Sequence, residues 1–132
     1  MLVIKNSQLN DDVISVLNLL IDLDINASAA FKLTRIMKEI SSIVEDKTKA
    51  EKKIMEKYGD KNEDGTYKTP IDQDGNPVEN AVSIKDIDSF TKEMSELLEV
   101  ENNIDYDKLD FEELGLTTIK VKDLLKIDFL FK

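Results

Sequence analysis

The longest regular pattern of hydrophobic residues in the chain lies between Asn26 and Gly59. Apolar residues recur there every three or four positions, the spacing that places side chains along one side of an α-helix. They are Ala29, Leu33, Ile36, Met37, Ile40, Ile43, Val44, Ala50, Ile54 and Tyr58. Asn26 or Ser28 can cap the start of a helix, and Gly59 is a residue at which a helix ends. The pattern predicts one uninterrupted long helix that serves as the scaffold of the fold.

A shorter amphipathic helix is predicted before it, capped by Asn10 or Asp11 and ending near Leu23. The connector of residues 24–27 is short, so we expect the two helices to form an antiparallel hairpin. The apolar run at residues 2–5 is typical of a strand or of a lead-in to the first helix.

Residues 60–80 have a different composition, rich in Asp, Asn, Gly and Pro. The pairs Asp64-Gly65 and Asp74-Gly75 are strong turn signals. They predict a protruding β-hairpin within residues 60–82 with its tip at residues 72–76. Pro70 and Pro77 would keep the hairpin at a sheet edge or outside any sheet.

The last third of the chain predicts a helix from Ser83 to about Glu99 and a short strand at residues 100–104. A final helix is expected from Val121, in a segment that starts at Thr117 or Thr118. Its expected apolar set is Leu124, Leu125, Ile127, Leu130 and Phe131. The sequence therefore predicts an α+β, mostly helical fold in a single domain of residues 1–132. Its parts would be the helical hairpin (1–59), the protruding β-hairpin (60–82) and the acidic helix, strand and C-terminal helix (83–132).

Charge is distributed unevenly along the chain, which carries a formal net charge of −10. Residues 1–59 have nine basic and nine acidic residues, whereas residues 60–132 have nine and nineteen. Residues 86–113 alone have eleven acidic residues and two lysines. Such a surface repels nucleic acid and anionic lipid and favours basic partners. We therefore expect a protein partner with a basic surface, and neither direct nucleic-acid binding nor membrane binding.

Few side chains in this sequence are suited to catalysis. The chain has no histidine and no cysteine, and Arg35 is the single arginine. Histidine is the commonest general base and thiolate a common nucleophile and metal ligand. The four glycines form no phosphate-binding fingerprint. The sequence thus favours a protein that is not an enzyme and needs no cofactor; a hydrolase built on a pair of carboxylates is the remaining enzymatic alternative.

One segment has the spacing of a calcium loop. Asp60, Asn62, Asp64 and Gly65 match the first six positions of the helix-loop-helix calcium motif. The twelfth position is Ile71, where that motif needs a bidentate glutamate, and Pro70 blocks the second helix. Polar turns without a metal are the favoured interpretation, with weak calcium binding as the alternative.

The candidate partner-binding residues fall in two groups. Carboxylates spaced along the third helix and the following strand could imitate a phosphate backbone and occupy a basic groove on a nucleic-acid-handling protein. These acidic candidates are Asp86, Glu93, Glu96, Glu99 and Glu101. Phe129 and Phe131 at the C-terminal end would either pack in the core or, if exposed, anchor a partner.

Several short motifs resemble those of short, acidic, uncharacterised proteins of tailed bacteriophages. The matching residues are Lys57-Tyr58-Gly59, Glu63-Asp64-Gly65, Asp74-Gly75-Asn76, Phe90, Glu93, Leu97, Leu98, Asp123-Leu124-Leu125 and Asp128-Phe129-Leu130. The resemblance implies a phage origin and transfers no activity or site. The expected function is a virion or assembly accessory protein that binds another protein; the alternative is an acidic inhibitor of a host protein. No apolar run approaches the roughly 18–20 residues of a membrane span and no signal peptide is evident, so host cytoplasm or virion is the expected location.

Overall fold

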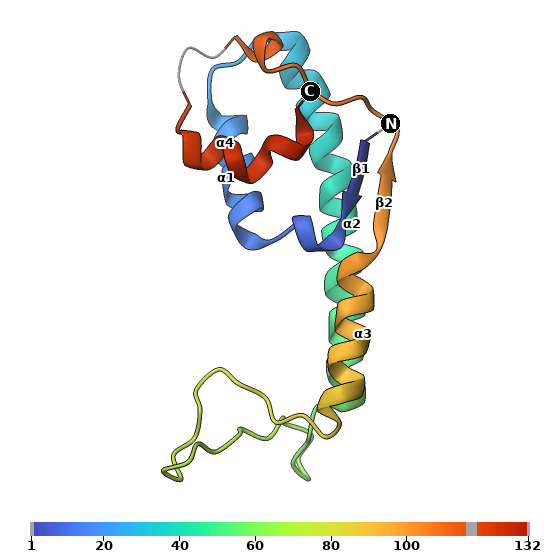
Figure 1. The fold of residues 1–132 in the computed structure, drawn as a ribbon, viewed down its shortest axis with the longest axis vertical. Helices are drawn as coiled ribbons and strands as arrows, with labels where there is room; N and C mark the ends of the chain where they lie inside the picture. Colours follow the sequence, from blue (N-terminus) through green and yellow to red (C-terminus); the bar gives the residue numbers. More distant parts are fainter. Residues whose placement is uncertain (1, 116–118, 132) are drawn as a thin grey trace. The chain divides into compact units, whose positions relative to one another are not determined.

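The computed structural model describes residues 2–115 and 119–131. Four α-helices and a small two-stranded antiparallel sheet are described, which confirms the predicted α+β, mostly helical class. Figure 1 shows how the elements follow one another along the chain. The expected start of the last segment at Thr117 or Thr118 lies outside the described residues.

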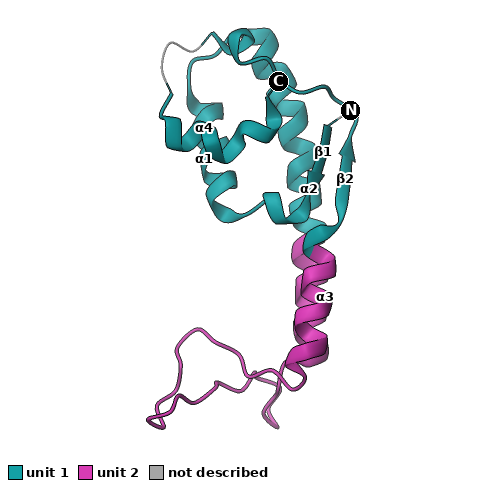
Figure 2. Cartoon of the chain, in the orientation of Figure 1, with its two compact units in different colours: residues 1–46, 98–132 teal, residues 47–97 magenta. Residues whose placement is uncertain are grey.

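The chain forms two compact units, coloured separately in Figure 2. Unit 1 contains residues 1–46 and 98–132, and unit 2 contains residues 47–97. Both boundaries between the units fall inside a helix. Folding as a single domain stays a prediction, because compactness does not report whether a unit folds independently.

Two helices at the start of unit 1 confirm the predicted elements. Helix α1 spans Asp11–Asp22, and the side chain of its N-cap Asn10 accepts a hydrogen bond of 3.0 Å from the Val13 amide. Helix α2 spans Ala27–Tyr58 without a break and extends from unit 1 into unit 2. The Asn26 carbonyl accepts the first helical bond of α2, from the Ala30 amide at 2.8 Å.

The core of unit 1 is made by residues distant in sequence. Its fully buried side chains come from α1, α2, both strands and the C-terminal region. They include Leu2, Ile4, Leu17, Leu20, Leu33, Ile36, Ile40, Ile104, Leu109, Leu114, Ile127 and Leu130. Burial of such side chains contributes roughly 1.5–3 kcal/mol each before the entropy cost of folding. The apolar stripe of α2 therefore stabilises unit 1 from Ala29 to Ile40.

The sheet of unit 1 pairs the N-terminal strand with a strand about a hundred residues later in the chain. Strand β1 (Leu2–Lys5) pairs antiparallel with β2 (Glu101–Ile104), with Leu2 opposite Ile104 and Lys5 opposite Glu101. Asn6, which is buried, continues the pairing, because its amide donates to the Val100 carbonyl at 3.0 Å. The side-chain amide of Asn102 donates to the Asn6 side chain at 2.8 Å and to the Ile4 carbonyl at 3.0 Å. A buried amide is thereby satisfied at the place where the strands end.

The C-terminal part of unit 1 contains helix α4 (Val121–Ile127) and a 3-10 turn, η3 (Asp128–Leu130). Helix α4 lies beside α1, as Figure 1 shows. Ile127, Leu130 and Phe131 are buried as expected, but Leu125 is 65% exposed. The expectation that Leu125 faces inward is wrong, because α4 ends after seven residues and only one of its sides meets the core.

Unit 2 contains the last turns of α2, a loop region and most of helix α3 (Ile87–Glu99). The last two residues of α3, Leu98 and Glu99, belong to unit 1. Helix α3 begins later than predicted. The expected cap Ser83 instead pairs through its backbone, donating to the Lys68 carbonyl and accepting from the Asp60 amide, both at 2.8 Å. Asp86 caps the helix, because its carboxylate accepts from the Ser89 amide at 3.2 Å.

The loop region differs from the predicted single β-hairpin. It forms two consecutive turns, each closed by one antiparallel bridge: Lys61 to Tyr67 and Ile71 to Pro77. Equivalent hydrogen bonds recur ten residues apart, from the Asn62 amide to Thr66 and from the Asp72 amide to Asn76. The sequence signal of two Asp-Gly pairs was thus correct for turns. No strand flanks these turns in residues 60–82, because Pro70 and Pro77 interrupt the ladder.

We expect Gly115→Ala to destabilise unit 1. Gly115 has φ +71° after the 3-10 turn η2 (Phe111–Leu114), and an added Cβ would lie 2.7 Å from the Asn26 side-chain oxygen. Asn26 holds this region through bonds from its amide to Leu114 and from its side chain to Glu113. The left-handed backbone costs an alanine about 1 kcal/mol, and the steric conflict adds to it.

Gly65→Ala is the matched control, because Gly65 has φ +88° and open space around its Cα. Urea denaturation followed by circular dichroism measures both variants. Equal loss of stability in the two would show that Asn26 is not packed against Gly115 as the structure places it.

Candidate functional site

The acidic candidate residues do not form one set of free carboxylates. Asp86, Glu93 and Glu96 belong to unit 2, whereas Glu99 and Glu101 belong to unit 1. Two of the five are ion-paired. The Glu93 carboxylate lies 2.9 Å from the Lys57 ammonium, and that of Glu99 lies 2.8 Å from the Lys5 ammonium. The sequence pattern did not show these pairs, because each joins helices or strands far apart in the chain.

These pairs affect the pKa values of their members. The hydrogen bond from Lys57 lowers the pKa of Glu93 below its ordinary value, and the same bond raises the pKa of Lys57. The pKa of Asp86 is lowered by hydrogen bonds from Ser89 at the start of α3. Glu99 raises the pKa of Lys5, first through their hydrogen bond and then through its charge. All of these groups are at the surface, where solvent screens the charges and limits what each interaction contributes to stability.

The densest acidic region of unit 1 is the segment from Glu101 to Glu113, which follows β2. It contains six acidic residues and one lysine, and most of these side chains are exposed. Glu113 lies 3.3 Å from the Lys32 ammonium. A cavity of about 320 Å³ lies here, lined by residues of both charges that include Lys32, Asp105 and Lys108. This segment is the part of the expected acidic surface that the structure keeps together.

The aromatic candidates have different environments from the acidic ones. Phe131 is buried, and its ring contacts Phe111 edge to face with a centroid distance of 5.9 Å. Phe129 packs against the same core and is half-buried. Phe131 is therefore not an exposed anchor. Its position beside Leu109, with which it forms a bridge, explains its burial.

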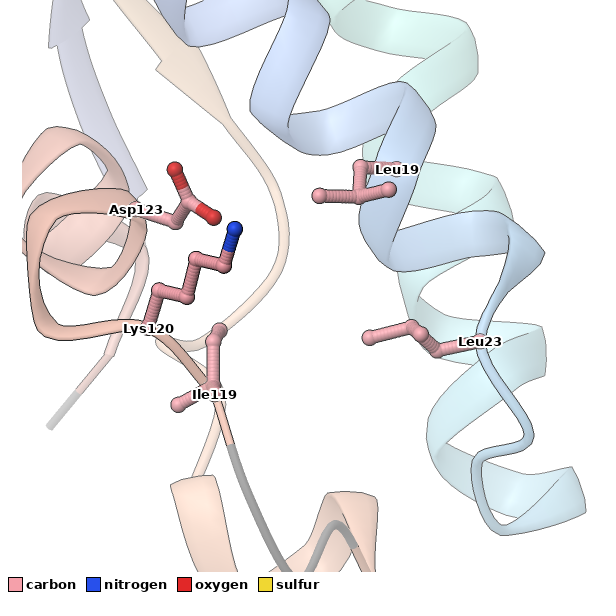
Figure 3. Close-up of a pocket in the computed structure, with 5 residues that line it drawn as sticks. All are labelled: Leu19, Leu23, Ile119, Lys120 and Asp123. Atoms are coloured by element: carbon pink, nitrogen blue, oxygen red, sulfur yellow. The ribbon is translucent and has the colours of Figure 1, made fainter.

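Unit 1 has an apolar groove that no pattern in the sequence predicted. It has a volume of about 430 Å³ and lies between α1 and the segment that enters α4. Figure 3 shows Leu19 of α1 and Leu23, the residue that follows α1, on one side and Ile119, Lys120 and Asp123 on the other. Leu19 is 52% exposed and Leu23 is 37% exposed. The apolar periodicity of the first helix does not predict that its C-terminal end borders an open groove.

Other large apolar side chains are exposed on the same two helices. Ile21 of α1 and Val121 and Leu125 of α4 are all exposed. Single exposed apolar residues are common, but several on two neighbouring helices beside an open groove are typical of a protein-binding surface. The walls of the groove offer apolar contact, and Lys120 and Asp123 offer charged partners at its edge.

The calcium-like segment is organised by its own hydrogen bonds. The Asp64 carboxylate accepts from the Thr66 hydroxyl at 2.6 Å and from the Thr66 amide at 3.0 Å. These bonds lower the pKa of Asp64. Among residues 2–115 and 119–131, no group of three or more acidic residues is arranged to hold a metal ion. Within the same residues, no helix combines the length and the apolar character needed to cross a membrane.

Comparison with known proteins adds no relative. No family model, no curated protein and no solved structure matches the chain. The function is therefore inferred from the apolar groove and the acidic segment of unit 1.

Acidification is expected to weaken unit 2. The folded pKa values of Asp64, Asp86 and Glu93 are lowered, so the unfolded chain binds more protons at acidic pH. Their contribution is present above the unfolded values near pH 4 and is lost as the pH falls through the folded values. Glu93→Gln should flatten the dependence of unfolding free energy on pH below about pH 5.

Glu96→Gln is the control on the same helix, because Glu96 is exposed and makes no ion pair among the described residues. Chemical denaturation at a series of pH values measures both variants. An unchanged pH profile for Glu93→Gln would mean that the Lys57 pair does not persist in solution.

Proposed function

We propose that this protein acts by binding another protein, as an accessory component of a phage particle or of its assembly, and that it has no catalytic activity. The observation that carries the proposal is the open apolar groove between α1 and the start of α4. Its leucines remain exposed although seventeen other hydrophobic residues in the described part of the chain are buried in the core. The phage context comes from the resemblance of the sequence motifs.

The groove suits a partner's apolar side chains better than a small polar substrate. Its volume of about 430 Å³ could hold several aliphatic side chains, and Leu19, Leu23 and Ile119 supply apolar contact. Burial of apolar side chains in such a pocket is what makes a few residues dominate the affinity of an interface. Lys120 and Asp123 would then fix the orientation of the bound segment.

The composition supports binding without turnover. The absence of histidine and cysteine from the whole sequence leaves only carboxylates, lysines and tyrosines for general acid–base chemistry. The acidic groups whose pKa values shift have them lowered, which keeps these groups ionised rather than poised to donate protons near neutral pH.

An accessory component should occur in purified phage particles at a fixed copy number, measured by quantitative mass spectrometry. Leu19→Glu should reduce incorporation at least about tenfold, because it places a charge in the apolar groove; a tenfold loss corresponds to about 1.4 kcal/mol. Asn18→Glu, at the neighbouring exposed position of α1, should be incorporated normally. Absence of the wild-type chain from both purified particles and assembly intermediates would refute the accessory role.

A second candidate function is inhibition of a basic host protein by the acidic surface. The exposed carboxylates between Glu101 and Glu113 favour this alternative. An inhibitor would be absent from particles and would co-purify with a bacterial protein. Its binding should weaken as salt concentration rises, because long-range attraction between charged surfaces is screened.

Charge neutralisation within the segment from Glu101 to Glu113 tests this candidate function directly. The test variant combines Glu101→Gln, Asp105→Asn, Asp107→Asn and Glu112→Gln, which are all at exposed positions, and should abolish binding to the co-purifying protein while the circular dichroism spectrum is unchanged. The control removes four exposed acidic groups elsewhere: Asp22→Asn, Asp24→Asn, Glu39→Gln and Glu56→Gln. Equal affinity of the two variants would exclude this candidate function for the segment.

A further inference from the structure

Unit 2 lacks a closed hydrophobic core. Within residues 47–97 the only buried residue is Gly59, whereas the described residues of unit 1 include seventeen buried hydrophobic ones. The apolar residues of α2 and α3 in unit 2 are only half-buried. They are Ala50, Ile54, Met55, Tyr58, Phe90, Met94 and Leu97. An amphipathic helix normally buries such a stripe completely, whereas within residues 47–97 part of this apolar surface stays open to solvent.

The contacts between α2 and α3 account for one side of each stripe. The rings of Tyr58 and Phe90 meet edge to face at a centroid distance of 6.3 Å, and Lys57 pairs with Glu93. Ile87 lies three residues before Phe90 on the same stripe and is 65% exposed. The spacing of Ile87, Phe90 and Met94 shows that the apolar face of α3 continues beyond its contact with α2.

The two helices of unit 2 carry opposite charges. The α2 residues from Lys47 to Tyr58 include five lysines and two glutamates. The α3 segment from its cap Asp86 to Leu97 includes four acidic residues and one lysine. The Lys57–Glu93 pair uses this complementarity once within the chain. Lys52, Lys53, Asp88 and Glu96 make no ion pair among the described residues.

We infer that unit 2 is a self-association surface, through which two copies of the chain form a symmetric dimer. A two-fold axis would place the basic α2 of one copy against the acidic α3 of the other, twice. A partner of uniform charge would match only one of the two helices, whereas a second copy matches both. The four helices would then bury the half-exposed stripes in the centre of a bundle.

This inference is independent of the proposed function, because the groove with Leu19 and Leu23 belongs to unit 1. It is tested by sedimentation velocity of the full chain between 1 and 100 µM. The expected result is a concentration-dependent species of twice the 15.0 kDa chain mass. A monomer throughout this range would overturn the inference.

Ile87→Glu should raise the dimer dissociation constant at least tenfold. An acid in the first turn of α3 suits the helix dipole, so the substitution should not unfold the helix, which circular dichroism checks. Leu125→Glu is the matched control: Leu125 has the same 65% exposure but belongs to unit 1, and its substitution should leave dimerisation unchanged. A dimer insensitive to Ile87→Glu, or one weakened equally by Leu125→Glu, would assign the interface elsewhere and overturn the inference.

The dependence of dimerisation on salt concentration distinguishes charge pairing from apolar contact between the two copies. If α2 pairs with α3 of the second copy, raising sodium chloride from 50 to 500 mM should weaken the wild-type dimer several-fold, because the facing charges are screened. A dimer of unchanged or greater strength at high salt would contradict the arrangement of basic against acidic helices.

Discussion

Burial of the apolar stripe of α2 is the interaction on which the structure depends. Ala29, Leu33, Ile36 and Ile40 of this stripe are buried in a core to which α1, the sheet and the C-terminal segment contribute. From Ala50 to Tyr58 the same periodicity continues, but its side chains are only half-buried. Helix α2 therefore belongs to two units, and its apolar side chains are more completely buried in unit 1 than in unit 2. The difference arises because more apolar segments pack against its N-terminal half.

The core of unit 1 depends on pairing between two strands that are far apart in the sequence. Pairing of β1 with β2 closes a loop of about a hundred residues, which costs conformational entropy. The buried Leu2, Ile4 and Ile104 offset that cost, and the bonds among Asn6, Asn102 and Ile4 fix the end of the pairing. Unit 2 has no comparable closure. Its loop region makes isolated bridges and local turns, which hold the backbone without burying side chains.

Charge has different roles in the two units. In unit 2 the basic part of α2 lies beside the acidic α3, and one acid of α3, Glu93, is paired with Lys57. In unit 1 the segment from Glu101 to Glu113 remains strongly acidic, although Glu113 pairs with Lys32. The net charge of −10 is thus a property of the whole chain and does not describe the charge distribution within either unit. A partner would meet an apolar groove and an acidic segment on unit 1, and a face with both charges on unit 2.

The sequence by itself determined the elements whose signals are local. The period of apolar residues located α1 and α2 to within a residue or two, and the Asp-Gly pairs located both turns. Tertiary structure decided which sides of these elements are covered. It buried Phe131, exposed Leu125 and left Leu19 and Leu23 beside a groove, although all four fit an apolar pattern or its edge. Helix α3 begins at Ile87 rather than after Ser83, because the backbone of Ser83 is hydrogen-bonded to Lys68 and Asp60. Periodicity states which residues can share a face; only contacts between distant segments decide whether water or protein meets that face.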